Sequence, residues 1–88
     1  MTPQVEEILN ILQEECAEVI QIISKIRRFG IEDAYSGKTN RENLTQEVAD
    51  VLLLIELLKA HAVYTDEEIH VAKLNKGSKL RKWSTIYE

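Results

Sequence analysis

The sequence predicts an all-α protein in which two long antiparallel helices are followed by shorter C-terminal helices. Three observations indicate this class. Apolar residues recur at helical spacing over about residues 5–29, Thr-x-x-Glu capping boxes precede later apolar runs, and no segment alternates with the period of a strand. With 88 residues, 44% of them hydrophobic, the chain has the size of one small domain, residues 1–88.

The first predicted helix, residues 5–29, carries an apolar face that covers about half of the helical wheel. Pro3 suits the first turn of a helix because its missing N–H is not needed there, and Gly30 suits the position just past the end. Glu15 falls inside the apolar face, and Glu18 lies at its edge. A carboxylate is therefore expected to point inward from this helix.

Residues 31–39 show no periodicity and are interpreted as a loop. The second predicted helix follows the loop and runs to about residue 63. Its segment 47–58 is apolar around most of its circumference, so we expect this helix to be buried. A step of about 100° per residue places Glu47 and Asp50 on the Leu54 side, among apolar residues.

A capping box at Thr65 and Glu68 predicts a third helix. Gly77-Ser78 is expected to interrupt it, and a last short helical piece then carries Leu80 and Trp83.

Charge is distributed unevenly along the chain. The net charge is −4, with six Lys or Arg against fourteen Asp or Glu in residues 1–72, and five Lys or Arg against one Glu in residues 73–88. One interpretation is that the acidic residues 1–72 and the basic residues 73–88 form a site for a metal and a polyphosphate. The alternative is that the basic residues only make the end of a helix soluble. The acidic composition of residues 1–72 argues against a nucleic-acid partner.

One cysteine, Cys16, allows no internal disulfide, no apolar run reaches transmembrane length, and no signal-peptide pattern is visible. We therefore expect a cytoplasmic protein with no membrane partner. A helix of 25 residues is about 38 Å long, whereas a compact chain of this size is about 31 Å across. The long helices must overhang a single-chain core, which predicts a homodimer or a larger assembly such as a homotetramer.

Two carboxylate pairs share the spacing i, i+3, Glu15 with Glu18 and Glu47 with Asp50. If the two helices pack antiparallel, the pairs can meet, and their repulsion must be neutralised. Carboxylate oxygens select Mg²⁺ or Mn²⁺, and no His/Cys set has zinc spacing. The competing interpretation is a set of buried salt bridges to basic residues of the first helix, namely Lys25, Arg27 and Arg28.

The combination Glu15-x-x-Glu18 and Glu47-x-x-Asp50 resembles the ExxE and ExxD signature of the MazG-like all-α nucleoside triphosphate pyrophosphohydrolases. Flanking segments, among them Arg28-Phe29-Gly30, resemble short phage-encoded members. The resemblance implies Mg²⁺-dependent hydrolysis of a nucleoside triphosphate to the monophosphate and pyrophosphate, with the four acids as metal ligands. Mn²⁺ would be a possible substitute for Mg²⁺.

The resemblance also implies further roles. Glu14 would hold another metal or, with Glu15, activate water, while Lys73 and Lys76 would contact phosphates. Gln21 and Lys25 follow Glu18 on nearly the same face and could reach base or phosphate. A purine deoxynucleotide is the favoured substrate, with dUTP and dCTP as alternatives. A non-catalytic helical dimerisation module, with its acids in inter-helix salt bridges, is the alternative function.

Overall fold

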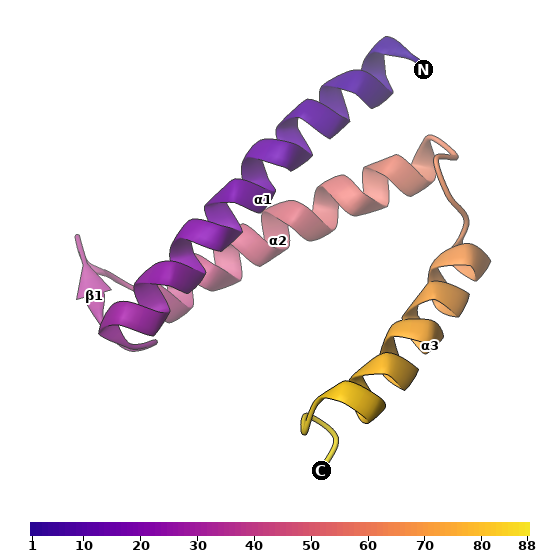
Figure 1. Ribbon diagram of the computed structural model, residues 1–88. Helices are drawn as coiled ribbons and strands as arrows, with labels where there is room; N and C mark the ends of the chain where they lie inside the picture. The colour runs from indigo at the N-terminus through magenta and orange to yellow at the C-terminus, as the bar shows by residue number, and fades with distance from the viewer.

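The computed structural model describes residues 1–88 and confirms the all-α class (Figure 1). Three helices make up most of the chain, with one short antiparallel hairpin between the first two. In chain order the elements are α1 (Pro3–Phe29), β1 (Ala34–Tyr35), β2 (Lys38–Thr39), α2 (Asn40–Ala60) and α3 (Asp66–Trp83).

The long helices α1 and α2 run antiparallel and pack against each other (Figure 1). Their main apolar cluster lies where the start of α1 meets the end of α2. It consists of Val5, Ile8, Leu54 and Leu58. Because this contact sets the register of the pair, the middle of α1 lies beside the first half of α2, which is where the paired acids are.

Local signals set the ends of the helices. The Thr39 and Thr65 hydroxyl groups accept hydrogen bonds from the backbone N–H of Glu42 and Glu68, so both predicted capping boxes are confirmed. Helix α2 ends at Ala60, earlier than the predicted residue 63, because Ala62 takes a left-handed conformation with φ of 60°.

The segment predicted as an irregular loop contains the β1–β2 hairpin. Ser36 and Gly37 both have positive φ, 55° and 83°, which is the pattern of a two-residue type I′ turn. Asn40, the first residue of α2, is the one buried polar residue of the chain, with 4% of its surface exposed. Its Nδ2 donates to the Gly30 carbonyl at 2.9 Å, and its backbone N–H donates to the Asp33 carbonyl at 2.8 Å. These bonds tie the loop to both long helices.

The predicted interruption at Gly77-Ser78 is wrong, because α3 is one continuous helix through both residues. A glycine inside a helix costs only about 1 kcal/mol relative to alanine, which the flanking helix formers and the N-terminal capping box can offset. There is therefore one C-terminal helix rather than two.

The molecule is flat and open. Its extents are 39 × 37 × 14 Å, and its radius of gyration is 15.9 Å, whereas about 12 Å is expected for a compact chain of this length. Helix α3 stands away from the α1–α2 pair (Figure 1). The expected burial of α2 is therefore wrong within one chain, since only Leu54 and Leu58 of its apolar residues are buried while Leu53 is 58% exposed. None of the helices combines the length and the hydropathy needed to cross a membrane.

Candidate metal centre

Three carboxylates meet at the middle of the helix pair. Glu15 comes from α1, and Glu47 and Asp50 come from successive turns of α2. One carboxylate oxygen from each residue lies within 4.8 Å of the other two, and all three residues are half-buried. The i, i+3 spacing puts both α2 acids on the face that α1 covers, as the sequence predicts.

The two α2 acids of the cluster differ in their hydrogen-bond partners. The Oε2 atom of Glu47 is buried and has no hydrogen-bond partner. Asp50 Oδ1 accepts a hydrogen bond from Gln46 Nε2 at 2.8 Å. The single ion pair of the chain within 4.0 Å joins Lys59 to Asp66, far along α2 from the cluster. The salt bridges considered as a competing explanation are therefore not formed within the chain.

Glu15 is the member of the cluster whose pKa is raised by its surroundings. Desolvation raises the pKa of Glu15 above its ordinary value, and the negative charge of Asp50 and the close approach of Glu47 raise it further. A raised pKa means that no nearby positive charge or hydrogen-bond donor offsets the negative charge of the ionised carboxylate. A cation placed among the three side chains would supply that compensation.

The residues present fit a divalent cation. The donor set consists of carboxylate oxygens alone, which hard cations such as Mg²⁺ and Mn²⁺ prefer. The buried, unpaired oxygen of Glu47 is the specific observation that favours a bound ion, because an unpaired buried carboxylate oxygen is costly. Glu15, Glu47 and Asp50 would hold such an ion.

A cavity of about 230 Å³ opens beside the cluster, and both long helices line it. Glu47 connects the cavity to the three acids, and Glu18 lies on its wall rather than inside the cluster. The predicted substrate residues Gln21 and Lys25 line the same cavity. Asn43 also lines it and was missed by the sequence analysis, although its place one turn before Glu47 on α2 is a usable signal.

Other predicted residues are not brought to the cluster. Glu14 is exposed on α1 and does not join the three acids. Lys73 and Lys76 are exposed on α3, which stands apart from the long helices in Figure 1. Their roles in water activation and phosphate binding remain predictions.

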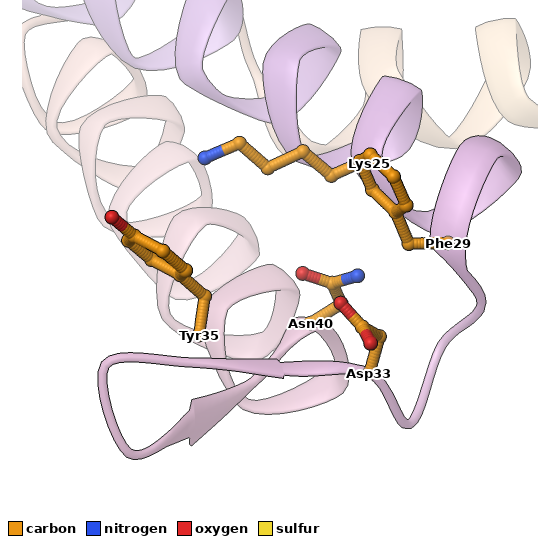
Figure 2. Close-up of a pocket in the computed structure, with 5 residues that line it drawn as sticks. All are labelled: Lys25, Phe29, Asp33, Tyr35 and Asn40. Carbon is orange, nitrogen blue, oxygen red and sulfur yellow. The ribbon is translucent and has the colours of Figure 1, made fainter.

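A second, larger cavity lies next to the first, between the end of α1 and the hairpin (Figure 2). Its volume is about 420 Å³, and its lining residues are Lys25, Phe29, Asp33, Tyr35 and Asn40. Lys25 lines both cavities, so the two are neighbours along one side of the helix pair. From the sequence, Tyr35 lies in the predicted loop of residues 31–39, where with Lys38 it could form a lid, and Asp33 and Asn40 were not predicted as site residues.

An antiparallel pair of helices with inward carboxylates on both partners defines an all-α protein with an acidic, oxygen-lined site. The model of the MazG nucleotide pyrophosphohydrolase domain matches residues 4–76, which includes both carboxylate pairs. The chain therefore belongs to the MazG nucleotide pyrophosphohydrolase family, whose members typically depend on a divalent metal. No curated protein and no solved structure gives a significant match to the chain.

Proposed function

We propose that this protein hydrolyses a nucleoside triphosphate, favouring a purine deoxynucleotide, to the monophosphate and pyrophosphate with Mg²⁺ as cofactor. The observation that carries the proposal is the buried, unpaired Glu47 Oε2 next to the Glu15 and Asp50 carboxylates. Membership of the family supports the reaction class. Mn²⁺, which accepts the same oxygen ligands, is the expected substitute.

The proposed reaction has two requirements, neutralisation of the triphosphate charge and removal of a proton from the attacking water. In the reaction a water oxygen bonds to the α-phosphorus, the bond from that phosphorus to the bridging oxygen breaks, and pyrophosphate leaves. Divalent cations, when bound, neutralise the triphosphate and lower the pKa of the attacking water. Glu15 belongs to the acidic cluster, and we assign it the role of accepting the water's proton. Glu14, one residue earlier on the exposed side, is the alternative acceptor.

The adjacent cavity supplies the groups that bind the substrate. Lys25 can donate to a phosphate oxygen, and Gln21 and Asn43 can donate or accept hydrogen bonds on the same wall. Glu18 faces this cavity and would complete the ligand set once substrate and cation are bound. Lys73 and Lys76 would reach phosphates only if α3 of another copy covers the site, which links their predicted role to a homo-oligomer.

The alternative is a helical dimerisation module whose acids are held in salt bridges. This alternative has less support, because no basic group of the chain forms an ion pair with Glu15, Glu47 or Asp50. A module of this kind would tolerate the loss of these charges and would not respond to divalent metal.

The test is pyrophosphate release from a panel of deoxynucleoside triphosphates, with Mg²⁺ and with chelator, for the parent and for Glu47→Gln. We expect the variant to lose about 100-fold or more in kcat/KM, because several kcal/mol of charge stabilisation depend on this ligand. Its metal-free form should melt at the same or a higher temperature, since one of three repelling charges is gone.

Glu56→Gln is the matched control, because Glu56 is exposed on the same helix and outside the cluster. This variant should keep the parent activity. The proposal would fail if the parent releases no pyrophosphate from any nucleotide with either metal. It would fail equally if Glu47→Gln unfolds while metal leaves the parent unaffected.

A further inference from the structure

The hairpin cavity of Figure 2 has the chemistry of a base-recognition site, and the geometry points to guanine as the base it takes. This inference rests on the proposed function, and it names the substrate that the acidic site would receive. The residues that carry it are the five that line the cavity, namely Lys25, Phe29, Asp33, Tyr35 and Asn40.

Asn40 is the central observation. Only 4% of its surface is exposed, yet half of its amide is unused. The Nδ2 group donates to the Gly30 carbonyl, and no donor of the chain reaches Oδ1. Because a carbonyl can only accept, the amide nitrogen must face Gly30, and the oxygen must face the cavity, as Figure 2 shows. A buried side chain thus presents one fixed acceptor to the empty space.

The second acceptor is Asp33. Its backbone carbonyl accepts the Asn40 N–H at 2.8 Å, which holds the two residues together. Its carboxylate makes no hydrogen bond or ion pair within the chain and lines the cavity beside Asn40. Lys25 extends across the opposite side and is the cationic donor of the cavity. The polar groups are therefore two acceptors, one cationic donor and the Tyr35 hydroxyl, which can donate or accept.

Guanine is the base that matches this set. It carries adjacent N1–H and N2–H donors and the acceptor O6 on a single edge, so a carboxylate can take both donors. Adenine offers one amino group next to a ring acceptor, cytosine the same, and thymine places its one N–H between two carbonyls. Each of these bases would form fewer hydrogen bonds with Asp33 and Asn40 than guanine does, and this difference would set the preference.

Size and position agree with this assignment. The cavity of about 420 Å³ falls within the range of roughly 300–1,000 Å³ typical of small-molecule sites. The rings of Phe29 and Tyr35 line it and offer apolar faces against which a base can stack. Asn40 and Glu47 are seven residues apart on α2, about 10 Å along the helix, which suits a base in this cavity and phosphates at the acids. Lys25 lies between the two cavities and contacts both.

The test compares Asp33→Asn with Glu32→Gln, which removes a charge from the neighbouring, exposed residue outside the cavity. Both proteins and the parent are assayed for kcat/KM with dGTP, dATP, dCTP, dTTP and dITP, whose base is guanine without the N2 amino group. The parent should prefer dGTP, with dITP about tenfold weaker. Asp33→Asn should lose about 10- to 100-fold with dGTP, change little with dATP, and shrink the gap between dGTP and dITP. Glu32→Gln should resemble the parent.

Equal use of the bases by the parent, a preference for a pyrimidine, or an equal loss on all substrates in Asp33→Asn would overturn the guanine site while leaving the hydrolase intact. If the parent hydrolyses nothing, the proposed function fails, and equilibrium binding of dGMP, dAMP and dIMP then decides the site by itself. Selective dGMP binding that Asp33→Asn abolishes supports it, and unselective or absent binding overturns it.

Discussion

The three clustered carboxylates have different surroundings, although they lie within one site. Asp50 has a hydrogen-bond donor in Gln46, Glu47 has one buried oxygen without a partner, and Glu15 has a pKa raised by desolvation and by its two neighbours. Because its pKa is raised, Glu15 binds a proton more readily in the metal-free folded protein than in the unfolded chain.

This difference predicts how stability depends on pH. Between 4.5, the ordinary pKa of Glu15, and its raised folded value, the folded state binds more protons than the unfolded state, so the free energy of unfolding falls as pH rises. The Glu15 contribution is fully present below the ordinary value and is lost as pH rises through the raised value. In chelator, the melting temperature should therefore drop over this range, and Glu15→Gln should flatten the drop.

The same site predicts the response to metal. Mg²⁺ or Mn²⁺ at 100 times its dissociation constant should add about 2.7 kcal/mol to the parent near neutral pH. Circular dichroism melts across a pH series, with chelator and with metal, measure both effects. An unchanged slope in Glu15→Gln, together with no metal effect on the parent, would contradict this account of the acidic site.

At the scale of single elements, two glycines have opposite backbone requirements. Gly37 has φ of 83° in the hairpin turn, a conformation that side chains with a Cβ rarely adopt. Gly77 lies inside α3 with ordinary helical geometry, and an added Cβ would meet only the end of the Arg81 side chain, at 3.4 Å. The hairpin needs its glycine, whereas the helix does not.

Alanine at these two positions should therefore shift stability in opposite directions. Gly77→Ala should raise the free energy of unfolding by about 1 kcal/mol, because alanine is the better helix former. Gly37→Ala should lower it by about 1 to 2 kcal/mol, because the positive φ is strained for alanine. Urea titrations followed by circular dichroism give both values. A destabilised Gly77→Ala would instead indicate a close approach of another surface to α3.

At the scale of the whole molecule, one chain covers too little of its own apolar surface. Six of the 88 residues are buried, and large side chains remain exposed on both long helices, among them Ile20, Leu52 and Leu53. Exposed apolar faces of this kind mark contacts between proteins. The open shape, with α3 away from the helix pair, leaves room for a second copy.

We therefore expect the protein to sediment at micromolar concentration with a multiple of the chain mass of 10.1 kDa. Leu53→Glu places a charge on the exposed flank of α2, where Leu53 is 58% exposed, and should shift the sedimenting mass toward that of one chain. A well-folded parent monomer under these conditions would contradict the prediction.

The three helices and the i, i+3 pairing of the acids could be predicted from local sequence patterns. Capping boxes at Thr39 and Thr65 act within one turn, and the i, i+3 spacing puts Glu47 and Asp50 on one face whatever surrounds them. These signals are local, so they can be recognised without knowing the fold. Two features were predicted wrongly: α2 ends at Ala60 rather than at residue 63, and Gly77, which is compatible with a break and with a helix, lies inside α3.

Which side chains share a cavity depends on the packing of the helices and the hairpin, and could not be predicted from local patterns. Packing of α1 on α2 put Glu15 among the α2 acids and left Glu18 on the adjoining wall, although both belong to one motif. The hairpin brought Asp33, Tyr35 and Asn40 to Lys25 and Phe29 of the preceding helix. Such contacts join residues that no helical or strand period relates, and they depend on how the loop closes and on which surfaces remain to be covered.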